Sequence, residues 1–198
     1  MNSDNIYQFN LELNDGSILP LSELKGKVIL IVNTAIHSPF ADFYPFMENL
    51  YRRFHRDGFE VVDVPSNQSQ EQTPESDEEI DTYCRKEFKT TFLRCKKQDV
   101  AGGNKSELFA YLIKKKKFKG FDSENLLTPV LNCREIKKGP DWMSNPEIRE
   151  NFTFFFISRS GKVVKRFEAT AQKEKIEACL VRLLDEIVYY FSNEVQLL

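Results

Sequence analysis

His37 and Ser38 are adjacent in the sequence and follow shortly after a run of apolar, largely β-branched residues. The pair supplies a base and a hydroxyl nucleophile, the two groups that serine hydrolases use. Side chains of adjacent residues rarely face each other, however, and the sequence names no acid that would orient His37. Hydrolase chemistry is therefore disfavoured.

The chain holds four cysteines, at positions 84, 95, 133 and 179, and no CxxC pair. Their spacing relative to the two histidines does not match a tetrahedral zinc site. The acidic residues between Glu71 and Glu79 suit a loop and the first turn of a helix, where carboxylates complement the helix dipole. We expect no bound metal and no resident cofactor.

The composition fits one domain over residues 1–198. Its 17 Phe and 7 Tyr concentrate apolar area in side chains that can fill a core. The 28 basic and 30 acidic residues leave a net charge of -2, without the basic excess that nucleic-acid binding needs. The opening residues lack the pattern of a signal peptide, and no apolar run approaches the roughly 20 residues that span a membrane. We expect a soluble, cytoplasmic protein with reduced thiols, and neither nucleic acid nor a membrane as partner.

The elements that must position a site begin with a hairpin. Residues 6–13 and 17–21 have the alternating pattern of two strands, and Asn14-Asp15-Gly16 suits the turn between them. The continuous apolar run 27–33 follows. Such a run predicts a strand that is covered on both faces and lies centrally in a sheet.

A helix is expected next, with Pro39 in its first turn and an apolar stripe from Phe43 to Phe54. Gly58 marks its end, and the run 59–64 predicts a second buried strand. Strand, helix and strand form a parallel pair with a right-handed crossover. The fold class is therefore α/β.

Residues 65–76 have loop composition at the carboxyl end of a parallel strand, the edge where sites form in open α/β sheets. Ser76 and Glu79 make a capping box that begins a helix. Its predicted buried stripe comprises Ile80, Tyr83 and Phe88. Another helix is expected over 104–115.

A long excursion without sustained periodicity occupies residues 116–150. Such insertions are usually functional or lie in an interface. The segments 152–157 and 162–167 predict an antiparallel hairpin, and 173–191 predicts a closing amphipathic helix.

The order of these elements and several short motifs resemble the glutathione peroxidase family. The motifs are Gly26-Lys27-Val28, Val32-Asn33-Thr34-Ala35, Pro65-Ser66-Asn67-Gln68, Glu78-Glu79-Ile80 and Asn151-Phe152-Thr153. The resemblance implies a thioredoxin-like fold, with a central mixed sheet flanked by helices. It also implies reduction of hydrogen peroxide or organic hydroperoxides in the response to oxidative stress, with glutathione or thioredoxin as the co-substrate.

The resemblance places Ser38 where the family carries its nucleophilic cysteine or selenocysteine. The chemistry needs a thiolate or selenolate, because the nucleophile must displace oxygen from oxygen and survive as a reducible sulfenic or selenenic acid. A serine hydroxyl is far less acidic and has no comparable oxidation ladder. We expect peroxide turnover to be absent or weak, whether Ser38 is native or engineered.

Gln68 and Asn151 match the family's Gln and Asn around the nucleophile, whereas Glu150 stands where its tryptophan is expected. Trp142, the only tryptophan, lies upstream in the insertion. The other departures are His37, Pro39 and Ser66. Several departures together favour a natural divergence. The negative charge of Glu150 would also disfavour a thiolate beside it, so we expect poor rescue by Ser38→Cys.

Cys84 lies where thioredoxin-dependent members of the family carry a resolving cysteine. A resolving thiol has a role only after another group becomes a sulfenic acid, which Ser38 does not. The favoured interpretation is a partly buried small side chain, as for the other cysteines. A thiol sensor that acts alone is the alternative.

The insertion 116–150 resembles the longer loop of tetrameric family members, which implies a homo-oligomer, dimer or tetramer; the alternative is a surface flap. The run Lys114–Lys117 with Lys119 would attract the carboxylates of glutathione or of an acidic partner, or would form a solvated face.

Two functions stay open. One is an oxidoreductase of the glutathione peroxidase type, active only if residue 38 is natively Cys or selenocysteine. The other is a non-catalytic binding or regulatory pseudoenzyme on the same scaffold.

Overall fold

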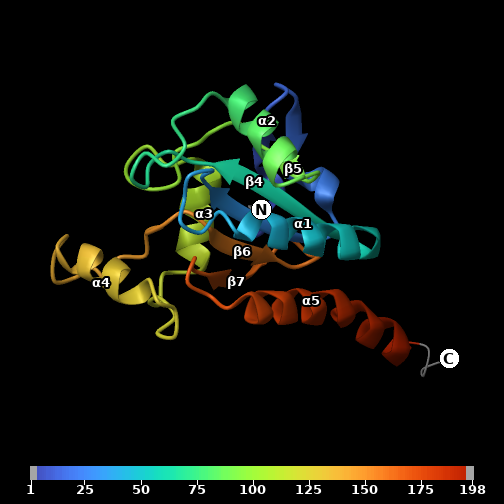
Figure 1. The fold of residues 1–198 in the computed structure, drawn as a ribbon. Coiled ribbons are helices and arrows are strands. Elements are labelled where there is room, and N and C mark those ends of the chain that lie inside the picture. Colours follow the sequence, from blue (N-terminus) through green and yellow to red (C-terminus); the bar gives the residue numbers. More distant parts are fainter. Residues whose placement is uncertain (1–3, 195–198) are drawn as a thin grey trace.

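A five-stranded mixed sheet forms the centre of the computed structural model, which describes residues 4–194 (Figure 1). Its strand order is β5-β4-β3-β6-β7. The strands are β3 (Val28–Thr34), β4 (Phe59–Pro65), β5 (Leu93–Arg94), β6 (Thr153–Ile157) and β7 (Val163–Phe167). β3, β4 and β5 run parallel, whereas β6 and β7 pair antiparallel to their neighbours. The predicted α/β class, mixed sheet and closing hairpin are confirmed.

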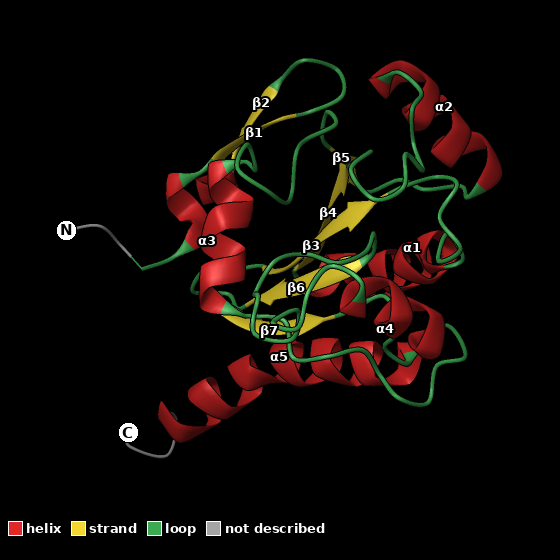
Figure 2. Ribbon diagram, turned by 90° about the vertical axis from the view of Figure 1, so that its left-hand side faces the viewer, coloured by secondary structure: helices red, strands yellow, loops and turns green. Residues whose placement is uncertain are grey.

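Helices cover both faces of this sheet (Figure 2). On one side, Val28, Leu30 and Val32 of β3 share a core with α1 (Phe43–Phe54) and α5 (Lys173–Glu194). On the other side, Ile29 and Ile31 pack with α3 (Glu107–Lys115). Successive side chains of a strand point to opposite faces, so every residue of β3 is buried, as its apolar run predicts.

The first long helix begins later than predicted. α1 starts at Phe43, and Pro39 lies in the turn before it. Pro45 is the proline inside the first helical turn, where its missing N–H would have no partner within the helix. The expected role of Pro39 therefore belongs to Pro45.

The amino-terminal hairpin is shorter than predicted. β1 (Asn10–Glu12) and β2 (Ile18–Pro20) form a separate two-stranded sheet, and residues 6–8 form a 3-10 turn instead of extending the first strand. Asn5 caps this turn, because its side chain accepts a hydrogen bond from the N–H of Tyr7.

The helix α2 (Asp77–Glu87) begins at the predicted capping box, in which Ser76 and Glu79 bond each other's backbone. Its buried stripe differs from the prediction. Tyr83 is exposed, and Cys84 lies in the core one turn after Ile80. Residues four apart share one helix face, so Ile80 and Cys84 are the pair that faces the sheet.

The insertion 116–150 contains a helix that its pattern did not predict, α4 (Thr128–Ile136). Val130 and Ile136 are exposed, whereas the carboxylate of Glu135 is fully buried. Glu135 is paired with Lys138 at 2.7 Å and Arg149 at 3.3 Å. α4 places one apolar side chain, Leu131, in the core and is otherwise held by buried polar and charged groups, so its apolar period is too weak to predict a helix.

A buried guanidinium joins β4, β5 and α2. Arg94 donates from Nε to Asp63 at 2.8 Å, from Nη1 to Asp81 at 2.6 Å and from Nη2 to Thr90 at 2.9 Å. The other carboxylate oxygen of Asp63 accepts from Thr34. Burial raises the pKa of Asp63, and Arg94 opposes that rise. The short strand β5 was missed because only this network and its two-residue pairing with β4 define it.

No helix within the described residues is both long and apolar enough to cross a membrane.

Replacement Arg94→Met tests the network. We expect the free energy of unfolding to fall by about 3–5 kcal/mol, because an uncompensated carboxylate would remain buried. Urea denaturation followed by circular dichroism measures the loss. The matched control is Arg85→Met, which removes a half-exposed guanidinium, leaves Asp81 paired with Arg94, and should cost less than about 1 kcal/mol. Equal losses for the two variants would contradict this account.

Candidate functional site

The carboxyl ends of β3 and β4 meet the amino end of β6 at one edge of the sheet. Asn33 of β3 lies opposite Val64 of β4 and Thr153 of β6. This register brings together the loops that follow β3 and β4 and the loop that precedes β6. The four predicted site residues lie on these loops: Ser38, Gln68, Glu150 and Asn151.

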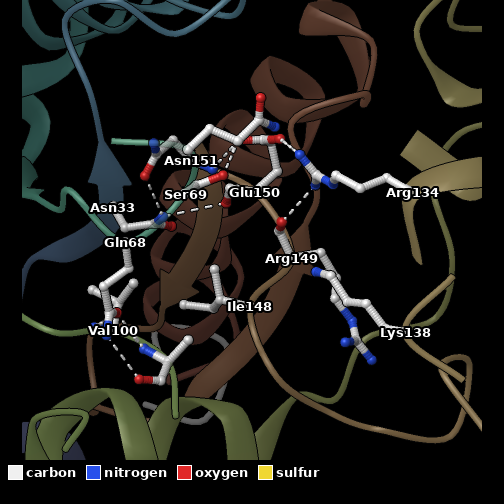
Figure 3. A pocket seen from close by; sticks show the side chains of 12 residues that line it. Asn33, Gln68, Ser69, Val100, Arg134, Lys138, Ile148, Arg149, Glu150 and Asn151 are labelled. Carbon is white, nitrogen blue, oxygen red and sulfur yellow. Dashed lines mark hydrogen bonds and ion pairs between the residues drawn. The ribbon is translucent and has the colours of Figure 1, made fainter. Parts of the chain in front are cut away.

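A pocket of about 290 Å³ opens at this edge (Figure 3). Gln68, Glu150 and Asn151 line it, together with Arg134 from the insertion. Ser38 is not among the lining residues. Three of the four predicted residues therefore share one pocket, and the fourth lies outside its wall.

Ser38 closes the turn that precedes α1. Its side chain is buried, and its Oγ accepts a hydrogen bond from the N–H of Phe40 at 3.2 Å. Its backbone N–H donates to Ala35, and its carbonyl accepts from the N–H of Ala41. A hydroxyl bonded two residues ahead is a common way to hold a turn. Ser38 therefore serves this turn, and no hydrogen bond links it to the three pocket residues.

Gln68 uses its side-chain amide on a neighbouring loop. Its Oε1 accepts from the N–H groups of Val100 at 2.7 Å and Ala101 at 2.9 Å, and its Nε2 donates to the carbonyl of Ala101 at 3.0 Å. Figure 3 shows Gln68 on the side of the pocket that faces Val100. This amide holds a loop in place, because both of its ends are bonded there.

Glu150 is a buried carboxylate with two strong partners. It accepts from Arg134 Nη1 at 2.6 Å and from Ser69 Oγ at 2.7 Å. Arg134 also donates to the carbonyl of Arg149 at 2.8 Å, so its guanidinium lies across the segment that leads into β6 (Figure 3). The expected effect of Glu150 on a neighbouring thiolate rests on its negative charge. In the structure Arg134 compensates that charge, which weakens its expected effect on a neighbouring thiolate.

Asn151 is bonded on both ends of its amide. Its Oδ1 accepts from Asn33 Nδ2 at 3.2 Å, and its Nδ2 donates to Gln72 Oε1 at 3.0 Å. Asn33 in turn accepts from the N–H of Thr153 at 3.1 Å. Asn33, Ser69, Gln72 and Arg134 are site residues that the sequence analysis missed. Asn33 stood within a quoted motif, and the other three gave no recognisable signal.

Phe152, which follows Asn151, has a left-handed backbone with φ +65° although it is fully buried. This conformation is unfavourable for a bulky residue and persists only where the surroundings enforce it. The ring of Phe152 packs against Phe43 and Tyr44, and its N–H donates to the carbonyl of Asn33 at 2.6 Å. Core packing thus holds the segment that carries Glu150 and Asn151.

The neighbours of Ser38 do not activate it. His37 is exposed, and its Nε2 lies 2.6 Å from Glu75 Oε1. Trp142 lies outside the pocket, with its ring 6.0 Å from that of Phe118. Neither residue takes the place of a catalytic base or of the missing indole.

Cys84 lies in the core of the molecule and outside the pocket. Burial raises the pKa of its thiol to about 12, with Arg94 opposing the rise and Asp63 adding to it. At neutral pH the side chain is therefore a protonated thiol, whereas thiol chemistry needs the thiolate.

Comparison with known proteins identifies the family. The family model of glutathione peroxidase matches residues 6–113. A glutathione peroxidase homologue of Neisseria meningitidis is 38% identical over 181 residues, which cover 90% of this chain and 99% of the relative. The hydroperoxy fatty acid reductase of Synechocystis is 35% identical over 182 residues, covering 92% of this chain and 97% of the relative. A glutathione peroxidase-like peroxiredoxin of Saccharomyces cerevisiae is 33% identical over 172 residues, covering 87% of this chain and 91% of the relative.

Solved structures support the same family and fold. The apo structure of Trgpx has a TM-score of 0.65 and 25% identity, covering 93% of this chain and 97% of that one. T. cruzi GPX1 has a TM-score of 0.63 and 26% identity, covering 91% of this chain and 96% of that one. A thioredoxin family protein of Chlorobium tepidum, with a TM-score of 0.56 and 16% identity over 89% of this chain and 92% of that one, shares the fold. The predicted thioredoxin-like fold is confirmed, and the chain belongs to the glutathione peroxidase family.

Proposed function

We propose that this chain is a glutathione peroxidase family member that has lost peroxide turnover at position 38 and uses the scaffold for binding or regulation. Ser38 carries the proposal. Its hydroxyl holds a turn, lies outside the lining of the pocket and cannot pass through a sulfenic acid. The family reaction, which consumes a peroxide and a thiol, is then absent or very weak.

The hydrogen bonds of the pocket support this proposal. A peroxidase site needs donors aimed at the oxygen atoms that react. Here the amides of Gln68 and Asn151 are both bonded to other protein groups, and Glu150 is an acceptor held by Arg134. The polar residues of the pocket stabilise loops and do not converge on Ser38.

A working peroxidase is the alternative, if the native chain carries Cys or selenocysteine at position 38. The names of two relatives, a hydroperoxy fatty acid reductase and a glutathione peroxidase-like peroxiredoxin, favour hydroperoxide and thiol substrates for that alternative. The native codon at position 38 decides between the two. A cytoplasmic location belongs to the proposal and is supported by Cys84, Cys95 and Cys133, which are free thiols.

A homo-oligomer, dimer or tetramer, built through the insertion 116–150 is a further part of the proposal. Leu126, just before α4, is 93% exposed, and on α4 Val130 is 66% exposed and lies three residues before the exposed Cys133. Exposed apolar side chains that cluster in this way mark interaction surfaces. The insertion therefore offers an apolar surface to a second copy.

Peroxide turnover is the direct test. The purified chain should consume neither hydrogen peroxide nor cumene hydroperoxide above background, with excess glutathione or reduced thioredoxin. Ser38→Cys should recover little activity, because a thiolate without aimed donors lacks the roughly 10²–10³-fold that one positioned donor contributes. Ser160→Cys, on the exposed turn between β6 and β7, is the matched control for an added thiol. Brisk peroxide consumption by the unmodified chain would refute the proposal.

Thiol labelling tests the alternative that Cys84 is a sensor. In the native protein at pH 8, a disulfide reagent should modify exposed Cys133 readily and Cys84 very slowly. The Cys84 thiolate becomes abundant only as the pH approaches its raised pKa of about 12, so its labelling rate should climb throughout the alkaline range. Mass spectrometry assigns the modified residues. Oxidised Cys84 in native protein treated with peroxide would favour the sensor.

The proposed oligomer is tested by introducing negative charge on α4 and just before it. We expect Leu126→Glu with Val130→Glu to dissociate it to a monomer, because carboxylates would be buried without partners. Size-exclusion chromatography with light scattering measures the mass. Lys86→Glu with Glu78→Gln on α2 serves as a surface control. A wild-type monomer, or an oligomer that survives the double change, would argue against this interface.

A further inference from the structure

A second groove, of about 640 Å³, shares no lining residue with the pocket described above. One wall is formed by residues 114–122, which end α3 and lead into the insertion. The other is formed by β7 and the residues that follow it, with Lys175 of α5 nearby. Segments that are far apart in sequence therefore build this groove.

Its lining is strongly basic. Eight lining residues are lysine or arginine, and only Asp122 and Glu168 are acidic. Three of the eight are paired: Lys115 with Asp4, Lys175 with Asp122, and Arg166 with Glu168. Five have no ion-pair partner among the described residues: Lys114, Lys116, Lys117, Lys119 and Lys165. In a chain of net charge -2 this is a local cationic site, which attracts an anionic partner.

The groove follows the edge of the sheet. Among the described residues, 4–194, β7 is the outermost strand of the sheet and pairs only with β6 (Figure 2). Five consecutive residues line the groove: Val164 to Phe167 of β7 and Glu168, which follows the strand. Successive side chains of a strand point to opposite faces, so a groove that touches all five runs along the open edge. Alternate N–H and C=O groups of β7 point to that edge, and no backbone group in the described part of the chain bonds them there, so they can pair with an added strand.

The shape selects among anionic partners. A duplex or a bilayer presents a broad surface, whereas this groove is bounded by residues 114–122 on one side and by a strand edge on the other. A single extended peptide advances about 3.3 Å per residue, and about five of its residues would span Val164–Glu168. The edge would supply backbone hydrogen bonds, and the lysines would select acidic side chains.

We propose that β7 is a docking edge at which an acidic, extended segment of a partner protein adds as a sixth strand and places its carboxylates among the five unpaired lysines. This inference does not depend on peroxide chemistry. It resolves the lysine run 114–119 in favour of an acidic partner, because the fold adds Lys165 to the run and places an unpaired strand edge beside it.

The test uses the full chain and a fluorescently labelled peptide of about eight residues in which Glu and Val alternate. Fluorescence anisotropy should show binding that weakens at least about tenfold when salt rises from about 0.05 to 0.5 M. Lys117→Glu with Lys119→Glu should weaken it at least about tenfold, whereas the matched control Lys86→Glu with Lys89→Glu should leave it unchanged. All four lysines are exposed, so circular dichroism should show native folds.

A second peptide of the same charge, with proline at its centre, tests strand addition. It should bind at least about tenfold more weakly, because proline cannot donate to the edge of β7. Amide exchange of β7 should slow on binding of the first peptide only. The proposal would be overturned if the two double lysine-to-glutamate variants bound the first peptide equally well, or if the two peptides bound with equal affinity. Tighter binding of a single-stranded oligonucleotide or of phosphatidylserine vesicles would also overturn it.

Discussion

The pairing of β3 with β4 on one side and β6 on the other is the constraint on which the site depends. Asn33 lies opposite Val64 and Thr153, so three loops that are distant in sequence must meet at one edge. The buried faces of β3 hold this register, because a slip of one residue would move its side chains to the opposite faces of the sheet. The side chain of Asn33 forms hydrogen bonds with Asn151 and with the backbone of Glu150 and Thr153. The strand register therefore also fixes where Glu150 and Asn151 lie in the pocket.

The polar groups at this edge are held by ion pairs and hydrogen bonds within the protein. A buried carboxylate costs several kcal/mol unless it is paired, and Glu150 is paired by a guanidinium from the insertion. Arg134 lies on α4, and the neighbouring Glu135 of that helix is paired with Lys138 and Arg149. The insertion is therefore coupled to the site through ion pairs. These ion pairs hold loops in place, and none of the paired side chains forms a hydrogen bond with Ser38.

The order of elements followed from the sequence because each long element has a strong local pattern. The apolar runs of β3 and β4 predicted buried strands, and the capping box predicted the start of α2. The misses have local causes too. Pro39 and Pro45 both suit a helix start, and only the backbone decides between them. The helix α4, which has a single core residue, and the strand β5 depend in large part on buried ion pairs, which no hydrophobic period can predict.

The sequence by itself determined the family, the fold class, and the absence of a thiol or selenol from position 38, since these depend on residue types and their order. Only the tertiary structure decided what the site residues do. Gln68 turns to Val100, and Glu150 pairs with Arg134. It also joined the lysines after α3 to the open edge of β7. The physical reason is that a polar side chain bonds whichever partner lies within about 3 Å in space, and here those partners come from distant segments of the chain.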